Sequence, residues 1–430
     1  MSYKCFSCVM AGICFTSTLL FAANEAAAAE ANHWTLESVI RRVIEVAPEI
    51  RQAEAEVAAR VGELTQAQAW PNPTIGLRAD NKLGQEDGRG GTDLTEMAIS
   101  QPLPFRRLAR ASAAARASLE SAQESRRYRR LVLEREAARV FHTLQLVGAK
   151  QRLAQERLRL VEEFPGAGRK QKGDPLVRYL TPLDRMRLAV LREEAQQTAI
   201  TAETEHGKTL AGFKTLLALA PGAVSEPVSL TLSAAPPGLE ILAATLDRRH
   251  PALAAAKQEA EAARAGIAVA ESQRLADPAL NVFRQRNVIT GERRDATGIG
   301  ISVQVPLWNT NSGTVAKARA ETNRAEAQVA ALERDIRNSL QQSHVHLTRL
   351  LEQAERYRVH LLEPAREVFD LTRRGFAAGE HNILALIDAY NTYFAARSRY
   401  LELLQEGWLA AADLRVAAGL SVLKSEEGQP

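Results

Sequence analysis

The chain contains nearly the same succession of features twice. In the first half, Pro48 interrupts a long amphipathic segment, and Pro73 and Pro102 bracket two alternating stretches. In the second half, prolines recur in the same order, displaced by about 204 residues, at Pro251, Pro278 and Pro306. An offset that persists along the whole chain indicates one duplicated unit. Its predicted order is helix, β-hairpin, long helix and return helix.

The composition favours long helices over a compact enzyme fold. Charged residues make up 25% of the chain and aromatic residues only 5%, with many Ala, Leu, Glu, Arg and Gln. This profile is typical of long helices and coiled coils. The net charge of +4 is small, and charges of both signs are interspersed. We therefore predict solvated helix faces and no nucleic-acid partner.

Motifs for catalysis and for cofactor or metal binding are missing from the sequence. It contains no nucleophile elbow, no HExxH zinc motif and no dinucleotide fingerprint. His344 and His346 are the nearest pair of histidines, and a spacing of two places them on different faces of a helix. We predict a protein that is not an enzyme and that has no cofactor and no metal site of its own.

The first 31 residues resemble a secretory signal peptide. Lys4 precedes an apolar stretch from Val9 to Ala22, and small residues follow up to Ala31. All three cysteines lie in this segment, at Cys5, Cys8 and Cys14. A cysteine-free mature chain suits an oxidising compartment. Lipidation at Cys14 stays open, although Ile13 stands where a small residue is expected.

The mature chain divides into two repeats and a tail. The first repeat covers residues 32–235, with a hairpin at about 72–104, and the second covers residues 236–424, with a hairpin at about 278–307. Residues 425–430 form the tail. In the first repeat a proline-free stretch from Leu108 to Phe164 predicts a helix roughly 85 Å long. Apolar residues recur in it every seven positions, as they do from Leu340 to Leu361, which is coiled-coil patterning.

The strands of both hairpins alternate between apolar and small or polar residues. The apolar positions include Ile75, Leu77, Met97, Ile99, Val282, Ile299, Ile301, Val303 and Val305. Strands of about 10 residues with one apolar face are typical of transmembrane β-barrels, although a half-buried hairpin of a soluble sheet has the same pattern. Hairpins alone are marginally stable in water, and open edges are not tolerated in lipid. We therefore predict that several copies of the chain contribute strands to one barrel with cyclic symmetry.

A break separates each long helix from its return helix. The first break, residues 165–175, superficially resembles a phosphate loop but lacks the required Gly and Lys-Ser/Thr spacing, so no nucleotide site is predicted. The second break runs from Arg373 to Asn382. The return helices begin near matched aspartates, Asp184 and Asp388.

These features together resemble TolC-type outer-membrane efflux proteins, and their order and spacing resemble most closely the CzcC-like branch that serves heavy-metal pumps. The most specific matches are the strand ends at Pro102, Pro306 and Trp308 and the segment from Gly375 to Ala389. The resemblance implies a mainly α fold with β: a homotrimer whose chains each give four strands to an outer-membrane barrel, joined to an α-helical barrel in the periplasm. It also implies a periplasmic adaptor, an inner-membrane RND pump and outer-membrane lipid as partners.

The same resemblance implies a gate at the periplasmic tip. Asp388 matches an aspartate of an inward carboxylate ring, whereas Ala385 stands where some relatives have a second one. The predicted gate candidates are Asp388, Asp184, His381, Glu380, Phe376 and Gly379. Three symmetry-related carboxylates would favour cations. The alternative is that Asp184 and Asp388 only meet the positive end of a helix dipole.

The predicted function is a passive exit duct of a tripartite efflux system. Heavy-metal cations as cargo rest on the resemblance alone. Drugs, organic solvents or a secreted polypeptide are alternative cargoes for the same fold. A periplasmic coiled-coil adaptor is a further alternative, although the paired hairpins argue against it.

Overall fold

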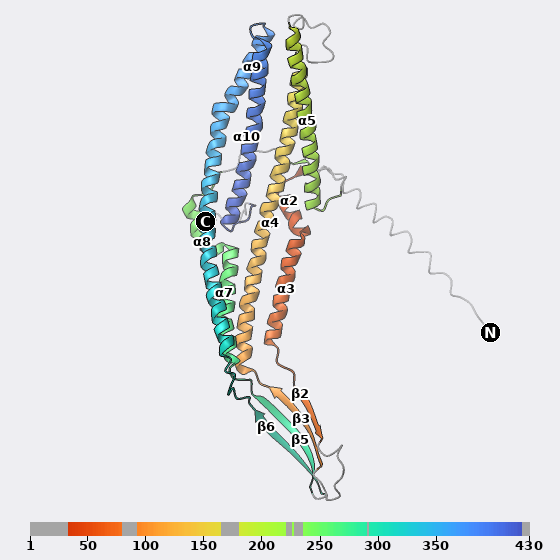
Figure 1. The fold of residues 1–430 in the computed structure, drawn as a ribbon, viewed down its shortest axis with the longest axis vertical. Helices are drawn as coiled ribbons and strands as arrows, with labels where there is room; N and C mark the ends of the chain where they lie inside the picture. The colour runs from red at the N-terminus through yellow and green to blue at the C-terminus, as the bar shows by residue number, and fades with distance from the viewer. Residues whose placement is uncertain are drawn as a thin grey trace, which may run out of the picture.

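The computed structural model describes residues 33–79, 93–164, 180–220, 226–227, 235–289 and 292–423. Several predicted features lie outside these residues: the signal peptide, the middle of the first hairpin at 80–92, the break at 165–175 and the tail at 425–430. The described chain is an elongated helical body with a small β-sheet at one end (Figure 1).

The elements of both repeats follow the order helix, hairpin, long helix and return helix. The first contains α2 (Leu36–Val46), α3 (Pro48–Gln68), β2 (Thr74–Ala79), β3 (Asp93–Pro102), α4 (Phe105–Glu162) and α5 (Pro182–Leu216). The second contains α6 (Leu239–Arg249), α7 (Pro251–Ser272), β5 (Ala279–Ile289), β6 (Glu292–Ser302), α8 (Ser312–Tyr357), the π-helical segment η3 (Arg358–Leu362), α9 (Glu363–Ala377) and α10 (Ile383–Ala417). A short parallel pair, β1 (His33–Trp34) and β4 (Glu226–Pro227), completes the described elements.

The helices begin where the sequence provides caps. Thr35 forms a capping box with Ser38 before α2, and Thr181 forms one with Asp184 before α5. Pro48 and Pro251 occupy the first positions of α3 and α7, where a missing N–H costs nothing. The predicted interruption at Pro48 is therefore a break between two helices. No helix within the described ranges combines the length and the apolar character needed to cross a membrane.

In each repeat, two helices that are not neighbours in the sequence are stacked end to end. α5 ends where α3 begins, with Phe213 and Leu217 in one buried cluster with Ala47 and Ile50. α10 ends where α7 begins, in the same relation (Figure 1). There, Gly419 lies close to His250. A Cβ added to Gly419 would be only 2.8 Å from the Cα of His250. Each half of the body thus contains one long helix and one helix made of two stacked segments.

The two predicted hairpins form one sheet. The strand order is β2-β3-β5-β6, all antiparallel, and β3 pairs with β5 from Asp93↔Val288 to Pro102↔Ala279. β6 ends at Ser302, whose partner Ala279 is the first residue of β5. Residues beyond Ser302 have no remaining partner there. Pro306 and Trp308 therefore lie past the strand that they were predicted to end, whereas Pro102 does end β3.

The two faces of the sheet differ as the alternation predicts. Ile75, Ile99, Val282 and Ile299 are aligned across all four strands and are 43–75% exposed. The adjacent row on the opposite face holds small or polar residues: Thr74, Ser100, Asn281 and Gly300. One face of the sheet is therefore an uncovered apolar surface.

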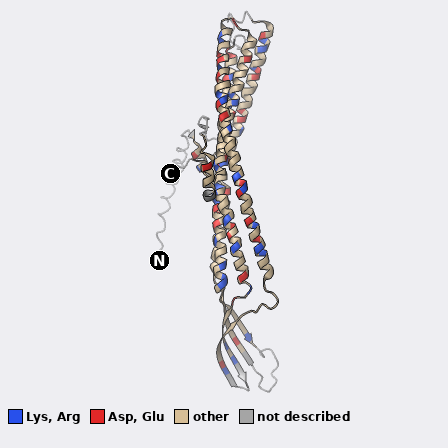
Figure 2. Ribbon diagram, turned by 90° about the vertical axis from the view of Figure 1, so that its left-hand side faces the viewer, with Lys and Arg blue, Asp and Glu red and all other residues tan. Residues whose placement is uncertain are grey.

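The helical body has solvated faces of mixed charge. Acidic and basic residues alternate along the whole length of the helices (Figure 2). Many of them pair within one helix, as Arg60 does with Glu56 at 3.0 Å and with Glu63 at 2.9 Å. Such exposed pairs contribute little to stability, so apolar burial between helices holds the body together.

One buried carboxylate attaches the C-terminal segment to α4. Glu134 is 1% exposed and accepts hydrogen bonds from Ser421 Oγ at 2.5 Å and from the Val422 amide at 3.0 Å. Arg130 donates to its other oxygen at 3.1 Å. A buried charge with three donors is well compensated, so this contact holds Ser421 and Val422 near the stacked helix ends.

Candidate functional site

The candidate site is the end of the body opposite the sheet, here called the tip. It contains the turn between α9 and α10 and the start of α5 (Figure 1). All six predicted gate residues belong to these elements. The structure therefore gathers them at one end of the chain, although it does not bring Asp184 and Asp388 into contact.

The turn from α9 to α10 is a Schellman motif built on Gly379. The Glu380 amide donates to the Gly375 carbonyl at 2.8 Å, and the Gly379 amide donates to the Phe376 carbonyl at 3.0 Å. Gly379 has a φ of +79°, which a residue with a side chain adopts only at a cost. Gly379 therefore has a backbone role in shaping the turn.

His381 lies against the backbone of this turn. A Cβ added to Gly375 would fall on the His381 ring, and the His381 amide donates to the Gly375 carbonyl at 3.3 Å. Phe376 packs partly buried on the core beneath the tip. Glu380 and His381 are exposed, so both are available to another chain.

The two matched aspartates have different surroundings. Asp184 accepts hydrogen bonds from the Thr181 amide at 3.2 Å and from Thr181 Oγ1 at 2.7 Å, as part of the capping box of α5. The helix-start interpretation thus describes Asp184. Asp388 is exposed in the second turn of α10, whose cap is Asn382, and lies beyond the range of the helix-end dipole.

An aromatic cluster that sequence reasoning missed lies beneath the tip. Tyr390 is fully buried between Phe164, Phe369 and Phe394, and its hydroxyl donates to the Arg157 carbonyl at 2.6 Å. Burial raises the pKa of Tyr390, so its phenol stays protonated and keeps this hydrogen bond. The spacing of aromatic residues along α10 is the signal that indicates such a buried face.

Polar contacts hold α10 against α4 below this cluster. Arg397 donates to both carboxylate oxygens of Glu156 at 2.7 Å, and Lys150 pairs with Glu402 at 2.7 Å. Both pairs join residues more than 240 positions apart in the chain, which links the first repeat to the second.

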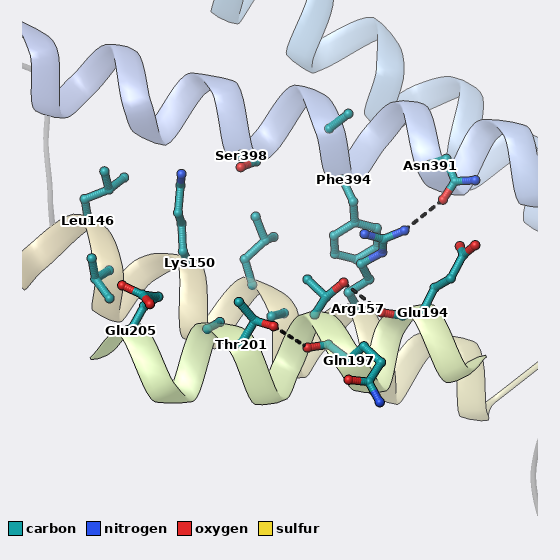
Figure 3. A pocket seen from close by; sticks show the side chains of 16 residues that line it. Leu146, Lys150, Arg157, Glu194, Gln197, Thr201, Glu205, Asn391, Phe394 and Ser398 are labelled. Atoms are coloured by element: carbon teal, nitrogen blue, oxygen red, sulfur yellow. Dashed lines mark hydrogen bonds between the residues drawn. The ribbon is translucent and has the colours of Figure 1, made fainter. Parts of the chain in front are cut away.

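A groove of about 960 Å³ runs between α5 and α10, with α4 as its floor (Figure 3). Its lining combines apolar side chains such as Leu146, Leu153 and Phe394 with charged ones such as Lys150 and Glu194. Arg157 donates to Asn391 at 3.0 Å across it. The lining residues of α4, from 146 to 157, span about 17 Å, or three helical turns.

The long helix of the second repeat contains a defect that α4 lacks. α8 continues into α9 through η3, and only Glu363 separates η3 from Pro364. Proline has no N–H and its ring collides with the carbonyl four residues earlier, so the ladder widens there. Leu361, predicted on the coiled-coil seam, is 43% exposed because the extra residue per turn rotates it away.

No group of three or more His, Cys, Asp or Glu side chains that could hold a metal ion is found among the residues that the structure describes.

An elongated body of heptad-patterned helices, continued by a small antiparallel sheet, is the fold of TolC-like outer-membrane channels. Residues 39–171 and 242–420, well over half of the chain, match the family described as outer membrane efflux protein. The chain belongs to the outer membrane efflux protein family. It is accordingly an outer-membrane channel protein and not an enzyme.

Individual relatives agree with this assignment. The cobalt-zinc-cadmium resistance protein CzcC of Cupriavidus metallidurans is 26% identical over 178 residues, which cover 41% of this chain and 42% of that protein. The matched segment thus spans less than half of that relative. The solved structure of VceC from Vibrio cholerae has a TM-score of 0.72 at 17% identity and covers 90% of this chain and 97% of VceC. CusC has a TM-score of 0.72 at 16% identity, with 90% and 92% covered. These two similarities show the fold.

Proposed function

We propose that this protein is the outer-membrane duct of a tripartite efflux system, through which heavy-metal cations leave the cell passively. The observation that supports this most directly is the uncovered apolar surface of the sheet at one end of a body of long helices. A surface with Leu77, Ile299 and Ile301 each at least 74% exposed is unfavourable in water and favourable in lipid.

The assembly we propose is a homotrimer. In the single chain, β2 and β6 are the edges of the sheet, and each would pair with the opposite edge of a neighbouring copy. Three copies then give a closed barrel of twelve strands. In the helical body, α5 exposes Leu183, Met186 and Val190 at helical spacing, and α9 exposes Val368 and Leu371. α5 and α9 lie at opposite sides of the chain (Figure 1), so contact between copies would bury both stripes.

The tip serves as the gate in this proposal. Each copy contributes one exposed Asp388, so three copies bring three carboxylates around the axis. Such a ring attracts cations and repels anions. Asp388→Ala should reduce the cation selectivity of the channel in a planar bilayer. Asp184→Ala is the matched comparison, and we expect it to affect the stability of the tip more than its selectivity, because Asp184 caps α5.

The groove between α5 and α10 is the proposed contact for the periplasmic adaptor. Its length of three helical turns and its mixed apolar and charged lining suit an amphipathic helix. An inner-membrane pump of the RND type would supply the energy, since the duct itself contains no catalytic site by sequence. Changing Thr198 or Thr201 in the groove to Arg should block adaptor binding without loss of the folded duct.

The cargo is tested by the growth of a deletion strain. The strain is plated on graded zinc, cobalt, cadmium, nickel, copper and silver salts, beside a panel of dyes and antibiotics, with and without the gene restored. Sensitivity confined to metals supports metal efflux and identifies the ion. Sensitivity to dyes and antibiotics but not to metals would support the role as an efflux duct and refute the metal cargo. Equal growth on every plate counts against efflux altogether.

A further inference from the structure

A polar pocket of about 400 Å³ lies where the end of α10 meets the start of α7. Three helices and the junction between α6 and α7 contribute to it: Tyr128, Arg135 and Arg139 from α4, His250 at the junction, Ser339 from α8 and Asp413 from α10. A volume of this size is in the range of small-ligand sites. The pocket is far along the helices from the tip and belongs to no part of the proposed gate or groove.

His250 in this pocket is buried without full hydrogen bonding. It is 3% exposed, and its Nδ1 has no partner among the described residues. Burial lowers the pKa of His250, and a hydrogen bond to the backbone of Val416 opposes that shift in part. A buried polar atom without a partner is uncommon in folded proteins and costs stability. A polar atom of this kind at a pocket is a candidate contact for a bound polar group.

The arginines of the pocket are also incompletely paired. Arg135 Nε is buried without a partner in the described chain, and the guanidinium is 3.7 Å from Asp413, too far for a hydrogen bond. Arg139 is 3.8 Å from Glu136, which does not line the pocket. Two arginines and only one carboxylate thus line the pocket. Planar guanidinium groups with free N–H donors bind oxyanions well.

We propose that this pocket binds a small oxyanion, a phosphate or a carboxylate, between Arg135 and Arg139. The hydroxyls of Tyr128, Ser339 and Ser343 would be further donors. Because the bound anion would contact α4, α8 and the ends of α7 and α10, it would stabilise the junction between the two stacked helices. This site does not depend on the cargo or on the efflux role of the protein.

Protonation of His250 would accompany binding. The titratable and charged groups that line the pocket with it are Tyr128, Arg135 and Arg139 from α4 and Asp413 from α10, whereas α8 supplies only Ile336, Ser339 and Ser343. An anion next to Nδ1 favours the charged imidazolium, so binding takes up a proton and becomes tighter as the pH falls from 8 to about 6.

The test is calorimetric titration of the purified full-length protein with inorganic phosphate, sulfate and citrate at constant ionic strength, with chloride as the reference. We expect one saturable site per chain. Binding of phosphate and sulfate would identify a site for phosphate-like anions, and binding of citrate would identify a site for carboxylates. Arg135→Gln should weaken binding at least about tenfold, because it removes a charged donor pair. Arg334→Gln, an exposed arginine of α8 that pairs with Asp335 outside the pocket, should leave binding unchanged.

Two further variants protect the test against misfolding. Arg139→Gln changes a side chain that is 50% exposed, so it should weaken binding of the anion while the protein stays folded. His250→Gln should abolish the proton uptake, measured by titration in buffers of different ionisation enthalpy, even where anion binding persists. Absence of saturable binding by all three anions would overturn the proposal. Equal affinities of wild type, Arg135→Gln and Arg139→Gln would overturn it as well.

Discussion

A glycine in β6 offers a sharp test of the sheet. Gly298 lies opposite Phe283 on the neighbouring strand, and a Cβ added there would be 2.9 Å from the Cε1 and Cε2 atoms of that ring and closer still to Cζ. Carbon atoms prefer to be about 3.5–4.0 Å apart, so the ring would have to move by about 1 Å. Gly300, two residues along the same face, has open space at its Cβ position.

Gly298→Ala should therefore destabilise the sheet and Gly300→Ala should not. Overpacking of this kind costs about 1–3 kcal/mol per chain, which becomes about 3–9 kcal/mol for a barrel of three chains. The assay is the temperature at which the outer-membrane oligomer dissociates on a semi-native gel, with the amount inserted measured beside it. Phe283→Val removes the ring, so adding it to Gly298→Ala should recover most of the loss in a double-mutant cycle.

The comparison of the two alanine variants tests whether Phe283 covers Gly298. If Gly298→Ala and Gly300→Ala dissociate at the same temperature, Phe283 does not cover Gly298 and the register of β5 with β6 is wrong. A loss that Phe283→Val fails to reverse would mean that Gly298 is needed for its backbone freedom and not for the ring contact.

Three further predictions concern the body of the protein. Ala218 follows α5 with a φ of +50°, so Ala218→Gly should raise the free energy of unfolding by about 1 kcal/mol. Gly419→Ala at the matching end of α10 should lower that free energy by more. Thermal unfolding followed by circular dichroism measures both. Burial lowers the pKa of His142 and of His250 below the unfolded value of about 6.5. Stability that is present above pH 6.5 should therefore be lost as the pH falls through the folded pKa values. A variant with glutamine at both positions should show a flatter pH profile of the unfolding temperature. Glu134→Ala leaves three donors without their acceptor, so it should cost about 3 kcal/mol and expose the C-terminal segment to carboxypeptidase, which unchanged digestion would contradict.

Local patterns were sufficient to predict the long helices and the strands of the two hairpins, but not η3 or the pair of β1 with β4. Alternation in β3 and β6, the heptads of α4 and the prolines at 48 and 251 act within one strand or helix, and the structure has these elements close to the expected places. The pairing of β3 with β5 was not foreseen, because it joins strands from different repeats. The end of β6 depends on where its partner begins, which alternation within β6 does not contain.

The candidate site was predictable only in part, for a related reason. The turn at Gly379 follows from its local sequence, and so does the cap formed by Asp184 and Thr181. The packing of Phe376 and the pairing of Arg397 with Glu156 join helices that are far apart in the chain. Asp184 and Asp388 match in the repeats, yet Thr181 at the cap of α5 engages Asp184, while Asn382 caps α10 without Asp388.

Within the described residues, the long helices of the two repeats also differ, and the difference bears on how each can bend. α4 is an unbroken helix of 58 residues, whereas its counterpart changes to a π-helix at η3, with only Glu363 between η3 and Pro364. A helix bends most easily where its hydrogen-bond ladder is already irregular. Below the tip, the contacts of Arg397 and Lys150 hold α10 to α4. Displacement of α9 would therefore concentrate at η3 and at the Gly379 turn, the two irregular points on either side of it. Among the described residues, the second repeat therefore has two points beside α9 where the chain can bend, whereas α4 of the first repeat is one continuous helix.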